Sequence, residues 1–232
     1  MIQSHYVCYD EDHALFDIFP KFLEFAQKHN MILTNEDSFK FKYTYYDTMG
    51  KGILKKGGFC RKMSRTELDE ESPSSFVIEY RPERKSRTQR ISPSERKSMS
   101  ELAKILSINI HFRELKFQGQ NYTASMIYNK PNDEEDIHPH LDFIFETGKV
   151  ESGHTQIECP VAFFSLIDTT ASKYNNFYAN QISDQTERCM KLFDQFMKSQ
   201  NVKRITSHKY AELTELITPD SELQSENNKR QK

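Results

Sequence analysis

Three side chains that can bind a divalent cation occupy alternate positions in the segment His138-Pro139-His140-Leu141-Asp142. If residues 138–142 are extended, His138, His140 and Asp142 project from one face of a strand, because side chains alternate between the two faces. Two imidazoles and a carboxylate could then hold a metal ion and leave positions open for water or substrate. The interpretation that we favour is a surface histidine pair at a loop-to-strand junction, with the metal site as the alternative.

The spacing His138-x-His140 resembles the His-hydrophobe-His motif of rolling-circle replication nucleases and relaxases. In that family two histidines bind the metal that polarises a scissile phosphate, and a tyrosine on a helix attacks the phosphate. Tyr174 and Tyr178 follow in the right order, and on a helix they would share one face. The resemblance therefore implies a metal-dependent nuclease, with Asp142 as the third metal ligand and Tyr174 or Tyr178 as the attacking group.

Two other resemblances arise at the same place. Residues 139–143 are similar to the His-x-Asp step of the 2-oxoglutarate-dependent iron hydroxylases, and the set His138, His140, Glu146 and Gly153 is similar to a cupin motif. Both families need further ligands or a second motif that the sequence does not supply, so neither is assigned.

Charge is distributed unevenly along the 232 residues, although the formal net charge is only -2. Residues 1–37 hold two bases and seven acids, whereas residues 38–104 hold sixteen bases and nine acids. A basic stretch of this kind can neutralise phosphates, so a nucleic-acid-binding protein is a further alternative, and an acidic protein surface would fit equally well. The most basic surface segment contains Arg81, Arg84, Lys85, Arg87 and Arg90.

Composition narrows the class of protein further. The chain is 36% hydrophobic and 12% aromatic, which is enough to build a core, and no apolar run approaches the length of a membrane-spanning helix. No secretion signal is recognisable at the first residues, and the four cysteines are too far apart for a zinc knuckle or a dense disulfide framework. We therefore expect a cytoplasmic protein with reduced, buried thiols.

Hydrophobic periodicity predicts the elements that must position these side chains. Residues 39–46 alternate aromatic with mostly polar side chains, which predicts a strand, and residues 76–80 predict a second one. Residues 108–117 and 122–128 should pair through a hairpin turn at 118–121, which contains a glycine. Helices are expected at residues 12–30 (interrupted or restarted at a proline), from residue 92 to about 106, and at about 208–217. Two more are expected between residue 167 and that last helix, the second of them holding residues 189–197.

These elements indicate an α+β fold, with a mainly antiparallel sheet and helices packed on one face. We expect a single domain over residues 1–218, a flexible basic connector at about 81–92, and a disordered polar tail at 219–232. Signatures of the common hydrolases, kinases and nucleotide-binding folds are missing. A divalent metal, which belongs to the alternative interpretation, is the one cofactor considered. The function that we predict is therefore a non-enzymatic interaction or adaptor subunit that binds other protein subunits in a larger cytosolic assembly.

Overall fold

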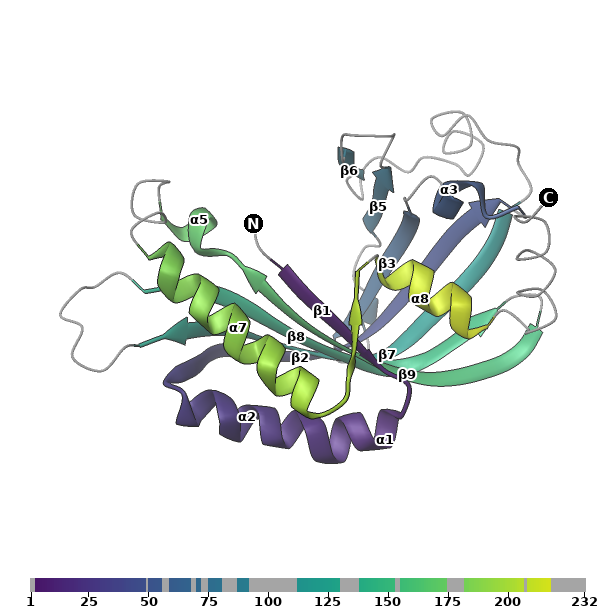
Figure 1. Cartoon of the computed structure of the whole chain (residues 1–232). Coiled ribbons are helices and arrows are strands. Elements are labelled where there is room, and N and C mark those ends of the chain that lie inside the picture. The colour runs from purple at the N-terminus through teal and green to yellow at the C-terminus, as the bar shows by residue number, and fades with distance from the viewer. Residues whose placement is uncertain are drawn as a thin grey trace, which may run out of the picture. The chain divides into compact units, whose positions relative to one another are not determined.

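The structure is a computed structural model, and it describes most of the chain (Figure 1). The described residues are 3–48, 50–55, 59–67, 70–71, 75–80, 87–91, 112–129, 138–152, 155–174, 182–206 and 208–217.

Long strands dominate this part of the chain. The strands are β1 (Gln3–Cys8), β2 (Met31–Thr48), β3 (Phe59–Glu67), β4 (Glu70–Glu71), β5 (Ser75–Tyr80), β6 (Arg87–Ile91), β7 (Phe112–Tyr128), β8 (His140–Ser152), β9 (Thr155–Asp168) and β10 (Lys203–Ile205). They form one sheet in the order β10-β1-β9-β8-β7-β2-β3-β5-β6, with β4 paired to β3. β1 pairs antiparallel with both β9 and β10.

Most of the helical segments are short. They are α1 (Glu11–His13), the π-helical turn η1 (Ala14–Ile18), α2 (Phe19–Lys28), α3 (Gly52–Lys55), α5 (Thr170–Lys173), α7 (Ser183–Ser199) and α8 (Lys209–Leu216). The predicted α+β class, with an antiparallel sheet and helices on one face, is confirmed.

The chain divides into two compact units. Unit 1 comprises Met1–Lys40, Gly119–Gly148 and Pro160–Thr206, and unit 2 comprises Phe41–Gln118, Lys149–Cys159 and Ser207–Lys232. The boundaries therefore fall inside four strands, β2, β7, β8 and β9. The predicted single domain over residues 1–218 stays a prediction.

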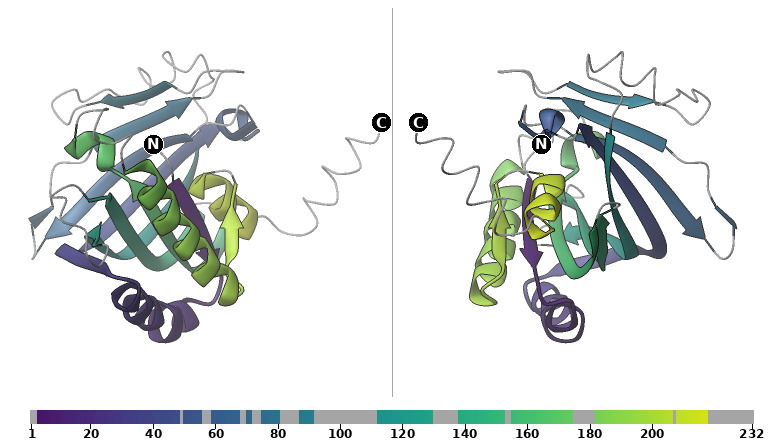
Figure 2. Two further views of the ribbon diagram at one scale, coloured as in Figure 1. Left: turned by 60° about the vertical axis from the view of Figure 1, so that its left-hand side comes forward. Right: turned by 90° about the vertical axis from the view of Figure 1, so that its right-hand side faces the viewer.

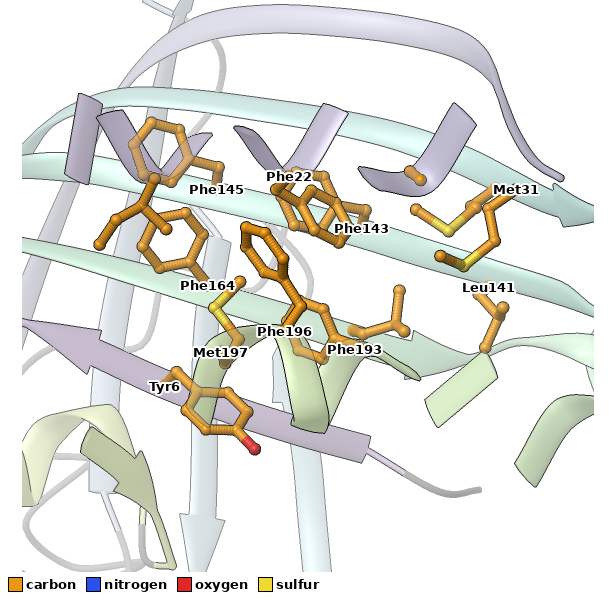
Figure 3. Packing of buried hydrophobic residues seen from close by; sticks show 14 of the residues in the cluster. Tyr6, Phe22, Met31, Leu141, Phe143, Phe145, Phe164, Phe193, Phe196 and Met197 are labelled. Atoms are coloured by element: carbon orange, nitrogen blue, oxygen red, sulfur yellow. The ribbon is translucent and has the colours of Figure 1, made fainter. Parts of the chain in front are cut away.

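The core of unit 1 lies between the sheet and the helices α2 and α7, which pack against each other (Figures 1 and 3). The Phe22 ring of α2 stacks 4.4 Å from the Phe143 ring of β8 and meets the Phe193 ring of α7 at 5.4 Å. Burying three aromatic side chains of this size removes several hundred Å² from water. The apolar spacing in α7 was predicted correctly from the sequence, and its buried residues are Cys189, Met190, Phe193, Phe196 and Met197.

The first helical region passes through Pro20 instead of stopping there. Proline has no N–H group, and its ring crowds the carbonyl four residues earlier, so an ordinary α-helical turn is disfavoured before it. The chain adopts the wider π-helical turn η1 immediately before α2, with Pro20 in the first turn of α2. Helix α2 then ends near Asn30, whose positive φ of 61° reverses the chain into β2.

The core of unit 2 is formed by the alternating aromatic side chains predicted at residues 39–46. Tyr45 stacks on Tyr210 of α8 with ring centroids 5.1 Å apart, and Phe41 contacts Phe117 at 4.9 Å. The buried carboxylate of Asp47 accepts hydrogen bonds from the Tyr210 hydroxyl and from a backbone N–H of α3. One aromatic strand face and one buried acid therefore fix α8 and α3.

The hairpin predicted at residues 118–121 is wrong, because β7 runs without a break from Phe112 to Tyr128. Gly119 serves close packing there instead of a turn. A Cβ atom at Gly119 would lie 2.0 Å from the Thr147 carbonyl oxygen and 2.5 Å from the Gly148 Cα atom of β8. Only glycine permits this approach of two backbones.

Three other sequence predictions have different outcomes. Residues 87–91, expected within a flexible connector, form β6 and pair with β5. The helix expected from residue 92 and the disordered tail at 219–232 lie outside the described residues.

Within the described residues, no helix combines the length and apolar character needed to cross a membrane. The cytoplasmic location stays a prediction.

Candidate functional site

The backbone of His140 is held by two threonines that follow β9. The Thr170 hydroxyl accepts a hydrogen bond from the His140 N–H and donates one to the His140 carbonyl oxygen, both at 3.1 Å. The Thr169 N–H donates to the same carbonyl at 3.0 Å. Pro139 cannot donate to a neighbouring strand, so β8 begins at His140, at the point where these threonines bind it.

Tyr174 reaches the same place through the short helix α5. The Asp168 carboxylate accepts a hydrogen bond from the Thr170 N–H at 3.0 Å and so starts the turn. The Tyr174 N–H donates to the Thr170 carbonyl oxygen at 3.0 Å, and the backbone of Tyr174 is extended. Thr170 therefore positions both His140 and Tyr174.

The two side chains meet in this arrangement. The His140 Nε2 atom lies 3.2 Å from the Tyr174 hydroxyl oxygen, and the two rings meet edge to face with centroids 5.5 Å apart. The predicted placement of Tyr174 on a helix is wrong, because α5 ends at Lys173. Tyr178 lies outside the described residues.

The surroundings of His140 favour its neutral form. Partial burial lowers the pKa of His140 below its usual 6.5, and the charges of Lys173 and His138 lower it further. Asp142 acts in the opposite direction, because its negative charge raises this pKa. A neutral imidazole keeps a lone pair on one ring nitrogen, so it can accept a proton there.

His138 and Asp142 lie near His140, as the alternating spacing predicts. The Thr169 hydroxyl donates to Asp142 Oδ1 at 3.5 Å, and the buried Nδ1 atom of His138 has no hydrogen-bond partner among the residues that the structure describes. Across the described ranges, however, no three His, Cys, Asp or Glu side chains come together in a way that could hold a metal ion. The predicted ligand set of His138, His140 and Asp142 is therefore not assembled as a metal site there.

We call His138, His140, Asp142, Lys173 and Tyr174 the His140 cluster. It contains a neutral base, a phenol in contact with that base, one nearby cation and one nearby carboxylate. A base and an acid at hydrogen-bond distance can pass a proton between them and to a third oxygen atom placed alongside. The cluster can therefore perform acid–base chemistry with the chain's own side chains.

The predicted basic binding segment is described only in part. Arg81, Arg84 and Lys85 lie outside the described residues, and Arg87 and Arg90 belong to β6, of which only the backbone is described. Binding of nucleic acid or of an acidic partner by this segment stays a prediction.

One arginine arrangement in unit 2 went unnoticed in the sequence. The Arg61 guanidinium carbon lies 4.4 Å from the centroid of the Tyr43 ring and 5.8 Å from that of Phe59, which is the range of a cation–π interaction. The position of Arg61 two residues after Phe59 places both on one strand face, and this signal could have indicated the contact.

The comparisons with known proteins find similar folds at low similarity. No protein-family model and no curated protein sequence matches the chain. Among solved structures, protein PH1819 from Pyrococcus horikoshii is 12% identical, covers 96% of this chain and 99% of its own, and gives a TM-score of 0.45. A candidate adenylyl cyclase from Hippeastrum, described as having a dominant triphosphatase activity, is 10% identical (94% and 98% covered, TM-score 0.42). A candidate adenylate cyclase from Vibrio parahaemolyticus is 13% identical (92% and 97% covered, TM-score 0.39).

These comparisons contradict the predicted function. Two of the three structures are described as enzymes, so the prediction of a non-enzymatic adaptor subunit in a larger assembly is wrong by this finding. Identities of 10–13% and TM-scores below 0.5 do not transfer a particular activity to this chain. Its chemistry has to be argued from its own side chains.

Proposed function

We propose that the chain is a hydrolase that acts on an anionic ester, with His140 as general base and Tyr174 as general acid. The contact of 3.2 Å between His140 Nε2 and the Tyr174 hydroxyl carries the proposal. The lowered pKa of His140 supports it, because a base must be unprotonated before it can accept a proton.

In the proposed reaction His140 accepts a proton from a water molecule as the water oxygen attacks the ester centre. The bond to the leaving oxygen breaks, and Tyr174 gives its phenolic proton to that oxygen. This leaves an imidazolium beside a tyrosinate, so the contact between them lets the proton return from His140 to Tyr174. Both groups are then neutral again, and no proton has to come from solvent.

The charge near the pair indicates the class of substrate. Lys173 is exposed and close enough to His140 to lower its pKa. An exposed cation beside an acid–base pair attracts anionic substrates and stabilises negative charge that develops on the reacting group. We therefore expect an anionic ester to react faster than a neutral ester with the same leaving group.

The test compares p-nitrophenyl phosphate with p-nitrophenyl acetate and follows the release of p-nitrophenolate. Inorganic triphosphate, followed by phosphate release, serves as a second anionic substrate. General acid–base catalysis contributes about 10²–10⁴-fold, so H140Q and Y174F should each lose at least about a hundredfold in kcat. K173Q should mainly raise KM for the anionic substrates.

Matched controls separate catalysis from general damage. H13Q changes an exposed histidine at the end of α1, and Y9F changes an exposed tyrosine directly after β1; both should keep the wild-type rate. Absence of turnover of both anionic substrates by the wild-type chain would overturn the proposal. Equal rates in H140Q, Y174F and the wild type would do the same.

A further inference from the structure

A cavity of about 440 Å³ opens in unit 1 where α7 ends and the chain returns as β10. Tyr6, Asp194, Lys198, Val202 and Arg204 contribute to its wall. Figure 2 shows α7 and β10 beside β1, and we call this cavity the Tyr6 pocket. Its volume lies within the range of small-molecule sites, about 300–1,000 Å³.

The local fold brings the pocket's side chains together. Asn201 has a positive φ of 55°, which reverses the chain directly after α7. β10 then runs antiparallel to β1, with Arg204 opposite Tyr6. Asp194 and Lys198 are four residues apart on α7, so they lie on one face of that helix. The pocket therefore combines one helix face with two neighbouring strand positions.

The pocket has an apolar floor with a polar edge. The Tyr6 ring is 3% exposed and packs edge-on against Phe193, with centroids 5.6 Å apart. Its hydroxyl points away from the cluster of phenylalanines in Figure 3 and donates to Asp194 Oδ1 at 2.8 Å. Val202 adds a second apolar side chain to the wall. An apolar body of a ligand could lie against these two side chains.

The charges that line the pocket do not balance. Arg204 lies 3.5 Å from Asp194, whose other carboxylate oxygen accepts from Tyr6. The ammonium of Lys198 makes no ion pair or hydrogen bond with any residue that the structure describes. Two cations therefore share the pocket with one carboxylate, which leaves a net positive charge. A group carrying negative charge would complete the pocket.

We infer that the Tyr6 pocket binds a small organic anion, with its phosphate or carboxylate at Lys198 and Arg204 and its apolar body against Tyr6 and Val202. This site consists of residues other than those of the His140 cluster, and it does not depend on the proposed hydrolase activity. Arginine and lysine side chains bind both phosphate and carboxylate groups, so the two kinds of anion are separate arms of the test.

Isothermal titration of the full chain with phenyl phosphate and with benzoate tests the inference, with benzyl alcohol as the neutral probe. Loss of a charge-assisted hydrogen bond weakens binding by about tenfold or more, so K198Q and R204Q should each raise the Kd by at least that factor. K191Q is the matched control, because Lys191 is on the same helix but pairs with Glu187 on an exposed face. It should leave the Kd unchanged.

Binding of either anion with the predicted losses supports the site, and the tighter of the two probes identifies the preferred anionic group. Thermal unfolding of each variant checks that the fold is intact. The inference is overturned if neither anion binds at millimolar concentration, or if benzyl alcohol binds as tightly as the anions. An equal loss in K191Q would also overturn it, since the effect would then be one of overall charge.

Discussion

Thr170 bonds both backbone groups of His140 through a single hydroxyl, which accepts from the N–H and donates to the carbonyl oxygen. The same residue fixes Tyr174, whose N–H donates to the Thr170 carbonyl oxygen. One buried residue, through its hydroxyl and its backbone carbonyl, thus links the proposed base to the proposed acid.

Replacing Thr170 by valine should therefore affect both stability and activity. The T170V variant keeps the shape of the side chain but leaves two backbone groups of His140 without this partner. The His140 carbonyl oxygen keeps the Thr169 N–H as a donor, whereas the His140 N–H loses its bond to the Thr170 hydroxyl. An unsatisfied backbone group costs about 1–3 kcal/mol, so we expect the free energy of unfolding in urea to fall by at least about 1 kcal/mol. T170S retains the hydroxyl and should stay close to the wild type. Equal stability of T170V and T170S would show that the hydroxyl bonds contribute little.

The titration of His140 should respond in opposite directions to two nearby substitutions. Lys173 lowers the pKa of His140, so K173Q should move it up toward 6.5, whereas Asp142 raises it, so D142N should move it further down. The other titratable groups beside His140 are His138 and Tyr174, which both variants keep. Histidine ring signals in NMR spectra recorded against pH measure the shift. Movement of both variants in the same direction would contradict this electrostatic account.

The same lowered pKa affects stability. Because the folded chain binds a proton at His140 less readily than the unfolded chain, stability rises with pH in this range. At His140 the free energy of unfolding keeps its full value above pH 6.5. It decreases as the pH falls from 6.5 toward the lowered pKa of His140 in the folded chain. Urea unfolding at several pH values should show a smaller acid loss in H140Q than in the wild type.

Substitution of Gly119 should be far more damaging than substitution of another glycine. In G119A the new methyl group would meet the Thr147 carbonyl oxygen at 2.0 Å, so the backbones of β7 and β8 would have to move apart. Overpacking typically costs about 1–3 kcal/mol, and backbone displacement can exceed that. G50A is the control, since no atom lies within 4 Å of its added methyl group. The free energies of unfolding of the two variants provide the comparison, and similar values would contradict the close approach.

The four thiols should divide into two classes of reactivity. Burial raises the pKa values of Cys60 and Cys189 to about 12, so both should resist a thiol reagent at pH 8 until the chain unfolds. Cys8 and Cys159 are only partly buried and should react in the folded state. Mass spectrometry of the labelled peptides assigns each site. Labelling of Cys60 or Cys189 at the rate of Cys159 would contradict the structure.

The elements that the sequence predicted well are those whose signal is local. The spacing of Cys189, Phe193 and Met197 and the alternation of Phe41, Tyr43 and Tyr45 depend on neighbours within one helix or strand, and both were predicted correctly. The role of Gly119 could not be predicted from the residues next to it in the sequence. A glycine between polar residues indicates a turn, and only the carbonyl of Thr147, on another strand, shows that it permits close packing.

The candidate site shows the same limit. The alternation of His140 and Asp142 was visible in the sequence, and Tyr174 was a candidate for a different role, the attack on a phosphate. Their contact, however, depends on the hydroxyl of Thr170, thirty residues from His140 along the chain. Nothing in the sequence connects Thr170 with His140, because their bonds are made only when β8 and α5 are placed together.

The pairing of β1 has a consequence for synthesis of the protein. β1 is synthesised before its partner strands, yet His5 pairs with Ser165 and with Ile205, and Tyr6 bonds Asp194 across 188 residues. During translation β1 and the helix region after it must therefore wait, with their apolar side chains uncovered, until nearly all of unit 1 has been made. Contacts this distant in sequence close slowly. We therefore expect Ile18 and Phe22, which are buried in the finished core, to be exposed during that interval, and exposed apolar side chains of this kind favour aggregation.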